Sequence, residues 1–369
     1  MTITGKTIII PLEGDFAHSA DFLRQTALTL AANNNQVCVY DQNHSHFWLK
    51  GKPTVKYPKH HNLHFHTPQY CLPGRRWRWV ERLNRRLSWW LFVHSLRQKN
   101  KILWFFYPNH FDLAQVKIAS CIKIYDCVDY QENTEKEKQL IKSVDYFFVN
   151  SQALAKLHRH QYKQPILLAA QGFFEPDAKL IKKSPLKFDR PVIGFVGGIN
   201  YRLDFPLLDQ LISNNQHWQF VFYGPKQENE LMDQKWQTKK WLNKIEAHPN
   251  TYFDQSSDRH QVYGIIKSFD VAIIPYNTKI AFNKYCYPMK VFEYLYFGKP
   301  VVGTNIKELS RSQFKNLVFA SNKVAAWQKL IEKVLKRKKD KKTTNLARAL
   351  AIKNSWQEKI HQIALKIII

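Results

Sequence analysis

Short runs of β-branched and aromatic residues alternate with segments of helical spacing along this chain. The run from Lys6 to Ile10 predicts a first strand, and apolar residues recur at helical spacing from Ser19 to Ala32. Gln36 to Tyr40 predicts a second strand. A strand, a helix and a strand within about 35 residues form a βαβ unit, which implies parallel strands covered by helices.

The same alternation continues along the chain. Further strands of a first sheet are predicted at 102–107, 122–125, 146–150 and 165–169. After a stretch rich in lysine, strands of a second sheet are predicted at 192–196, 220–223, 251–253, 271–275 and 300–302. Helices between them are predicted at 207–212, 227–247, 258–268, 289–297 and 322–338. The pattern predicts an α/β fold with two consecutive parallel-sheet domains.

Length and composition agree with two globular domains, and the charge adds an expectation about partners. The chain has 369 residues, of which 44% are hydrophobic and 23% charged. Lys and Arg number 56 against 29 Asp and Glu, so the net charge is +27. An excess of this size predicts an anionic partner: nucleic acid, anionic lipid or a phosphorylated substrate. No apolar stretch approaches the roughly 18 residues of a spanning helix, and no signal peptide is visible. We therefore expect a cytoplasmic location, with any membrane contact peripheral and on the inner face of the cell membrane.

The sequence gives little support for a metal site. The five cysteines include no CxxC pair and fit reduced thiols. Four histidines cluster near Cys71, but their spacing matches no standard zinc pattern: His60, His61, His64 and His66. A His-rich loop is the prediction for this segment, and no metal or cofactor is expected.

The most specific passage is PMKVFEYLYFGKPVV, from Pro288 to Val302, which follows the strand VAIIP at 271–275. It resembles the donor-binding half of GT-B glycosyltransferases, in particular glycosyltransferase family 4, also called group 1. Other passages resemble this family in the same order along the chain: YDCVDY at 125–130, VDYFFVNS at 144–151 and GFVGGINYRLDFPLL at 194–208.

This resemblance implies a domain organisation. It implies two Rossmann-like parallel-sheet domains that face each other across a cleft. The N-terminal domain, 1–184, would bind the acceptor, and the C-terminal domain, 185–350, would bind a nucleotide-sugar donor. A C-terminal helix, 351–369, would cross back onto the first domain.

The resemblance also implies a function. It implies transfer of a sugar from a nucleotide-diphosphate sugar to a glycan or lipid-linked acceptor, with retention of configuration and without a metal, in cell-surface polysaccharide or glycolipid synthesis. The chain contains no D-x-D motif, which argues against the metal-dependent single-domain class of glycosyltransferases. The competing hypothesis is a degenerate GT-B protein that acts as a basic membrane or nucleic-acid adaptor. A GT-B sugar epimerase is less favoured, because relatives of that type carry different motifs.

Several residues of the second domain are candidates for donor binding. Pro288, Met289 and Lys290 stand where a helix is expected to begin, and the free N–H groups and the Lys290 charge favour a phosphate there. Glu293 lies one turn later, and the resemblance implies that it binds the ribose. The alternatives are a solvated surface lysine and a capping or surface carboxylate. Tyr285 stands where many family members carry a second Glu, which leaves the donor sugar open.

The loop after strand 192–196 adds further candidates. Gly197 and Gly198 would let the backbone approach a ligand closely. Arg202 would neutralise the diphosphate, or alternatively form a structural salt bridge with Asp204.

Acidic and histidine residues of the first domain are candidates for acceptor chemistry. Asp15 and His18 lie in the loop after the first strand, and such loops line the ligand crevice of open α/β sheets. Asp126 and Asp129 follow another strand and could orient an acceptor hydroxyl or take its proton. The alternative for each Asp is a turn or a helix cap.

The segment from Arg75 to Lys101 is both basic and aromatic, with Glu81 as its one acid. A basic amphipathic helix of this kind suits the headgroup region of an anionic leaflet. The alternative is a helix that packs its tryptophans into the domain core. The residues predicted to contact a membrane are Arg78, Arg82, Arg85, Arg86, Trp89 and Trp90. No nucleic-acid motif accompanies the charge, so no nucleic-acid partner is expected.

Overall fold

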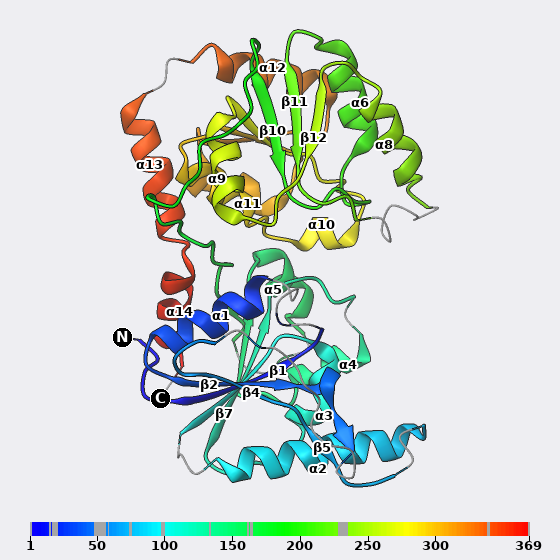
Figure 1. Ribbon diagram of the computed structural model, residues 1–369, viewed down its shortest axis with the longest axis vertical. Helices are drawn as coiled ribbons and strands as arrows, with labels where there is room; N and C mark the ends of the chain where they lie inside the picture. Colours follow the sequence, from blue (N-terminus) through cyan, green and yellow to red (C-terminus); the bar gives the residue numbers. More distant parts are fainter. Residues whose placement is uncertain are drawn as a thin grey trace. The chain divides into compact units, whose positions relative to one another are not determined.

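The computed structural model shows a chain that divides into two compact α/β units. One unit comprises Met1–Gly172 together with Trp356–Ile369, and the other comprises Phe173–Ser355. Each unit has one large parallel sheet covered by helices (Figure 1). The residues that the structure describes are 2–14, 16, 21–47, 57, 59–73, 76–96, 100–132, 134–160, 162, 165–227, 235–337 and 340–367.

The first unit is built on a seven-stranded parallel sheet in the order β4-β2-β1-β6-β7-β8-β9. Its strands are β1 (Thr7–Leu12), β2 (Gln36–Asp41), β4 (Leu63–His66), β6 (Lys101–Phe105), β7 (Cys121–Cys127), β8 (Tyr146–Val149) and β9 (Leu167–Leu168), with a separate pair β3 (His46–Phe47) and β5 (Gln69–Tyr70). Its helices are α1 (Asp21–Ala32), α2 (Arg78–Ser95), α3 (Phe111–Ala114), α4 (Glu135–Ile141), α5 (Gln152–His158) and α14 (Trp356–Ala364). The central strand β1 is buried along its whole length, as expected for a β-branched run covered on both faces.

The second unit is built on a six-stranded parallel sheet in the order β12-β11-β10-β13-β14-β15. Its strands are β10 (Val192–Val196), β11 (Gln219–Tyr223), β12 (Thr251–Asp254), β13 (Val271–Ile274), β14 (Val301–Gly303) and β15 (Val318–Ala320). Its helices are α6 (Phe205–Asn214), α8 (Thr238–Glu246), α9 (Arg259–Ser268), α10 (Ala281–Tyr285), α11 (Lys290–Tyr296), α12 (Val324–Leu335) and α13 (Lys341–Ile352).

Side chains at the helix starts explain where several helices begin. The hydroxyl of Ser151 accepts the N–H of Leu154, and that of Thr134 accepts the N–H of Glu137. The carboxylates of Asp204, Asp258 and Asp340 cap α6, α9 and α13 in the same way. Each cap satisfies an N–H group that has no partner inside its own helix.

The predicted α/β fold is confirmed, and details differ from the sequence expectations. The first unit ends at Gly172 rather than at residue 184, and its C-terminal segment begins at Trp356 rather than at 351. That segment carries α14, which packs beside α1. The histidine segment predicted as a loop includes β4, which pairs with β2 through His64 and His66. The helix predicted over 227–247 lies partly outside the described residues, and α8 is its described part.

Each sheet has one point at which the chain changes direction across the sheet. In the first unit the chain runs from β1 outward to β2 and β4, then returns to the other side of β1 at β6. In the second unit it runs from β10 to β11 and β12, then returns to β13 beside β10. Ligands of open α/β sheets bind at the carboxyl ends of the strands at such switch points. A ligand of this chain is therefore expected at the loops after β1 and β6, and at those after β10 and β13.

Candidate active site

The donor-site candidates of the second unit meet at the switch point between β10 and β13. Gly197 follows β10 with a φ of +134°, in a region that side chains disfavour, and a Cβ at this position would overlap the Lys290 side chain. The Lys290 Nζ atom donates a hydrogen bond to the Tyr276 hydroxyl at 3.0 Å. A glycine backbone and an ammonium group are thus held against each other at the carboxyl end of the central strand.

Arg202 joins the group of residues around Gly197 and Lys290 through its contact with Tyr276. Its guanidinium carbon lies 4.8 Å from the Tyr276 ring centroid and 4.2 Å from that of Phe282. Its Nε donates to Asn283 Oδ1 at 2.9 Å, and Asn283 Nδ2 donates back to the Arg202 carbonyl at 2.8 Å. Asp204, the alternative partner for Arg202, caps α6 instead. Tyr276 therefore contacts both cations.

Helix α11 holds the remaining donor candidates. Pro288 is buried and Met289 half-buried just before the helix, and Glu293 is 8% exposed within its first turn. The Tyr294 hydroxyl accepts the N–H of Val196 at 2.9 Å, which ties α11 to the end of β10, and burial raises the pKa of this phenol. Because α11 has only seven residues, the Lys290 charge is a larger source of attraction for a phosphate than the helix end.

Gly198 lies in the same loop after β10 and has little room for a side chain. A Cβ at Gly198 would meet the side chain of Gln227, so the loop after β10 is packed closely on that side as well.

Polar side chains at the switch point of the first unit are connected by hydrogen bonds. Asn109, after β6, donates from Nδ2 to Glu13 Oε1 at 2.7 Å, and Lys136 Nζ donates to Asn109 Oδ1 at 2.8 Å. Burial, together with the nearby charges of Glu13 and Asp129, raises the pKa of Tyr107. Asp129 is half-buried at this edge. These groups can donate and accept hydrogen bonds to a hydroxylated ligand.

His110 lies beside this edge and stays neutral. It is 3% exposed, and burial together with the Arg85 charge lowers its pKa to about 3. It therefore adds no positive charge at neutral pH.

The prediction that Asp126 is catalytic is wrong. Its side chain is fully buried and forms an ion pair with Lys359 of α14, at 2.9 Å between Nζ and Oδ2. A carboxylate held in this way cannot reach an acceptor from solvent. Its role is to join β7 to α14, across 233 residues of sequence.

We expect Asp126→Ala to destabilise the protein by about 3–5 kcal/mol, because it leaves the Lys359 ammonium buried and unpaired. The measurement is urea unfolding of the full chain, and the matched control is Glu132→Ala, which removes an exposed carboxylate from the loop after β7. Wild-type stability in Asp126→Ala would contradict the structural role.

Two of the catalytic candidates, Asp15 and His18, lie outside the described residues. Asp129, in the loop after β7, is thus the predicted catalytic residue that lies beside the switch point of the first unit, where its charge acts on Tyr107.

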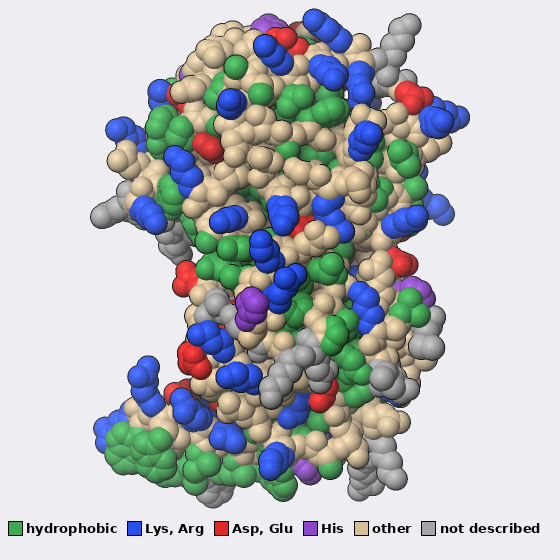
Figure 2. Space-filling view, turned by 180° about the vertical axis from the view of Figure 1, so that it is seen from behind, with side chains coloured by type: hydrophobic (Ala, Val, Ile, Leu, Met, Phe, Trp, Pro, Cys, Tyr) green, Lys and Arg blue, Asp and Glu red, His purple; other side chains and the backbone are tan. Residues whose placement is uncertain are grey.

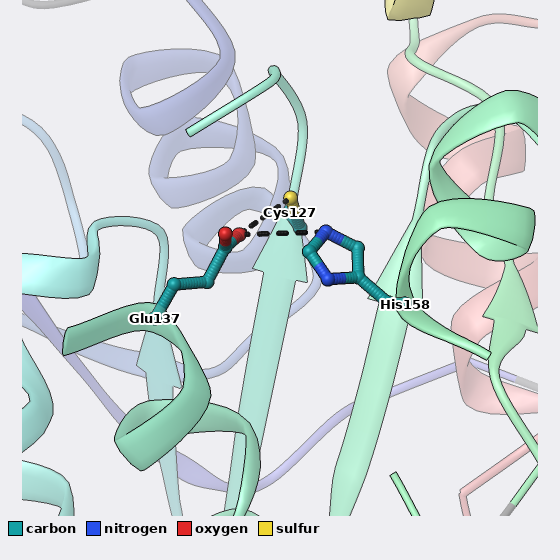
Figure 3. A group of neighbouring side chains, drawn as sticks. All are labelled: Cys127, Glu137 and His158. Atoms are coloured by element: carbon teal, nitrogen blue, oxygen red, sulfur yellow. Dashed lines mark hydrogen bonds and ion pairs between the residues drawn. The ribbon is translucent and has the colours of Figure 1, made fainter. Parts of the chain in front are cut away.

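A second group of ionisable side chains lies inside the first unit (Figure 3). Cys127 of β7, Glu137 of α4 and His158 of α5 are fully buried, and their ligand atoms lie within 4.8 Å of one another. Glu137 Oε1 accepts from the Tyr125 hydroxyl at 2.9 Å and lies 3.6 Å from Cys127 Sγ and 3.7 Å from His158 Nε2. Burial raises the pKa of the Cys127 thiol well above its usual value, which disfavours the thiolate that a metal requires. We interpret the group as a buried polar link in which Glu137 of α4 hydrogen-bonds to β7 and lies at ion-pair distance from His158 of α5.

The residues predicted to contact a membrane divide into two groups. Trp89 is fully buried against Tyr40 and Phe105, so its prediction is wrong. Arg85 also contacts the protein rather than facing outward, because its Nη2 donates to Asp112 Oδ1 and to the Asn109 carbonyl, each at 3.1 Å. The exposed members are Arg78, Arg82, Arg86 and Trp90.

Sequence reasoning missed the residues that connect the candidates. Tyr276 and Asn283 link Lys290 to Arg202 in the second unit, and Tyr107, Asn109 and Lys136 line the edge of the first. The available signal was position: Tyr276 follows a strand that ends in proline, and Tyr107 follows β6 directly. Polar residues directly after parallel strands are candidates on that ground alone.

Comparison with solved structures defines the fold class. The chain superposes on sucrose-phosphate synthase from Thermosynechococcus elongatus with a TM-score of 0.70 at 15% identity, over 98% of both chains. It superposes on Anabaena HepE, solved in complex with UDP and glucose, with a TM-score of 0.68 at 13% identity, again over 98% of both chains. At this identity the likeness shows the fold, which is GT-B.

Sequence comparison relates the second unit to one family of glycosyltransferases. Residues 177–350 match the family Glycosyl transferases group 1. A curated relative, the putative teichuronic acid biosynthesis glycosyltransferase TuaH of Bacillus subtilis (strain 168), is 31% identical over 122 residues. That match covers 33% of this chain and 28% of the relative's length. The region 177–350 is therefore similar to group 1 glycosyltransferases, within a chain of GT-B fold.

Proposed function

We propose that this protein transfers a sugar from a nucleotide-diphosphate sugar to a glycan or lipid-linked acceptor. The observation that carries the proposal is the meeting of Gly197, Lys290 and Arg202 at the switch point of a domain that is similar to group 1 glycosyltransferases. Two cations beside a glycine backbone suit a diphosphate, which needs charge neutralisation and close backbone approach. The acceptor would bind at the edge lined by Glu13, Asn109 and Asp129.

The chemistry follows from where charge develops. Negative charge grows on the diphosphate as the glycosidic bond breaks, and preorganised cations there lower the barrier. Lys290 and Arg202 are preorganised by Tyr276 and Asn283, and they could supply this stabilisation without a metal. Retention of configuration and metal independence rest on the family resemblance. The donor and acceptor are substrates, and the proposal includes no cofactor.

The proposed setting is synthesis of a cell-surface polysaccharide or glycolipid, on the cytoplasmic side of the membrane. The name of the Bacillus relative supports it, since that protein is called a putative teichuronic acid biosynthesis enzyme. Among the described residues, no helix is both long and apolar enough to cross a bilayer.

The proposal is tested by screening nucleotide sugars for thermal stabilisation and then for transfer. A donor that binds the folded state raises stability by RT ln(1 + [L]/Kd). Stabilisation followed by glycosyl transfer supports the enzyme. Stabilisation by no nucleotide sugar would favour the alternative, a degenerate GT-B adaptor, whose one support is Tyr285 at the position of the second family Glu.

We expect Glu293→Ala to weaken nucleotide binding by about 1.5–3 kcal/mol, because it removes a charged hydrogen-bond acceptor for the ribose. The measurement is calorimetric titration with UDP or GDP, whichever binds the wild type. Glu308→Ala, another buried carboxylate of the same unit, controls for loss of stability alone. Unchanged nucleotide affinity in folded Glu293→Ala would remove the ribose assignment.

A further inference from the structure

Helix α2 exposes a continuous row of large apolar side chains. Trp79, Leu83 and Trp90 follow one another at helical spacing and are 67%, 46% and 41% exposed, and Leu91 beside them is 46% exposed. Trp77, directly before the helix, is 54% exposed. These five residues, the apolar ridge of α2, make up more than half of the large apolar side chains that are exposed among the described residues.

Positive charge borders the ridge. Arg82 and Arg86 lie on the exposed face beside Leu83 and Trp90, and Arg76 and Arg78 lie at its N-terminal end, all four exposed. In Figure 2 hydrophobic side chains and neighbouring basic ones gather along the lower edge of the first unit, where α2 runs (Figure 1). The surface is therefore apolar in its centre and cationic at its border.

The opposite face of α2 holds the helix in place. Trp89 packs in the core, the Ser88 hydroxyl lies 2.9 Å from that of Tyr40, and Asn84 hydrogen-bonds the backbone of Leu72 in both directions. Arg85 pairs with Asp112. These contacts fix α2 without using the ridge, so packing within the unit does not account for the exposed tryptophans.

We propose that the ridge of α2 docks in the plane of an anionic phospholipid leaflet. An amphipathic helix with Trp and Leu on one side and arginines beside them binds the headgroup region by apolar insertion and by attraction to anionic lipid. Tryptophan favours that region because its ring is apolar and its N–H is polar. An anionic leaflet supplies negative charge next to every arginine that borders the ridge. A protein partner would instead need acidic side chains placed opposite each of these arginines, so the leaflet is the occupant that we propose.

Docking would also place the acceptor edge near the lipid, and this part rests on the proposed function. Arg85 donates from α2 to the carbonyl of Asn109, whose side chain donates to Glu13. Two hydrogen bonds thus connect the membrane-facing helix to the edge proposed to bind the acceptor. A sugar carried on a lipid would reach that edge without leaving the leaflet.

The experiment is co-sedimentation of the full chain with vesicles of phosphatidylcholine alone and of phosphatidylcholine with phosphatidylglycerol, across a salt series. We expect binding to the anionic vesicles, weakened but not abolished at ~0.15 M salt, where charges are screened beyond about 8 Å. Arg82→Gln with Arg86→Gln should lower the partition coefficient about 30-fold, from about 1 kcal/mol per basic residue. Trp79→Ser with Trp90→Ser should lower the partition coefficient at least tenfold and should abolish the binding that persists at high salt.

Matched variants control for charge and for apolar surface in general. Lys239→Gln with Lys240→Gln removes two exposed cations from α8, and Leu346→Ser removes an exposed apolar side chain from α13. Neither should change binding by more than twofold, and thermal unfolding checks that every variant is folded. The proposal is overturned if wild type ignores anionic vesicles at low salt, or if the control variants lose as much binding. It is also overturned if the ridge variants only convert a dimer into a monomer in sedimentation velocity. Vesicle binding needs no donor, so failure of sugar transfer would leave this result standing.

Discussion

Lys290→Ala is expected to lower the turnover number for sugar transfer by about 10²- to 10³-fold, the usual cost of removing one preorganised group that stabilises transition-state charge. The ammonium group is held between the Tyr276 hydroxyl and Gly197, where the diphosphate is proposed to lie. Steady-state kinetics with saturating donor measures the effect, and nucleotide affinity should fall less than turnover.

Two further variants separate charge from position. Lys284→Ala removes an exposed lysine from the neighbouring helix α10 and should leave turnover within about twofold. Lys290→Arg keeps the charge but places a planar group where Gly197 leaves little room, so we expect only partial activity. Wild-type turnover in Lys290→Ala would assign the lysine to a solvated role.

The fold was predictable because its strands are short apolar runs covered on both faces. Val192–Val196 is the predicted and the observed extent of β10, and β1 and β7 differ from prediction by one or two residues at each end. The missed strands β4 and β15 lie at sheet edges. β4 reads LHFH, with only Leu63 buried, so its composition resembles a polar loop. An edge strand is defined by its pairing with a neighbour, which local sequence does not contain.

The sequence could predict a site residue only where its position next to a strand end or a helix start marked it. Gly197 and Lys290 follow from a strand end and a helix start, but their contact joins segments about 90 residues apart. Asn283 of α10 and Arg202, in the loop after β10, likewise meet only after these two segments have packed together. The pairing of Asp126 with Lys359 depends on α14 belonging to the first unit. On α2, the core residue Trp89 and the surface residue Trp90 are consecutive in sequence, and only the packing of the helix decides which of them is buried.

Asp129→Asn is expected to lower turnover about 100-fold or more while nucleotide affinity stays unchanged. Asp129 belongs to the first unit, and the proposed donor residues belong to the second, so the two effects should separate. As a base or as an acceptor for the attacking hydroxyl, its carboxylate is needed in the ionised form. The acidic limb of the pH profile of kcat/KM should therefore disappear in the variant.

Glu132→Gln is the matched control, because it removes an exposed carboxylate three residues along the same loop. It should retain turnover and the acidic limb. If Asp129→Asn also retained both, Asp129 would be a turn residue, and Glu13 would become the stronger candidate. Glu13 is a half-buried carboxylate of the same edge, and Asn109 donates a hydrogen bond to it at 2.7 Å. A loss of activity in Glu13→Gln would then transfer the proton-accepting role from the loop after β7 to the loop after β1.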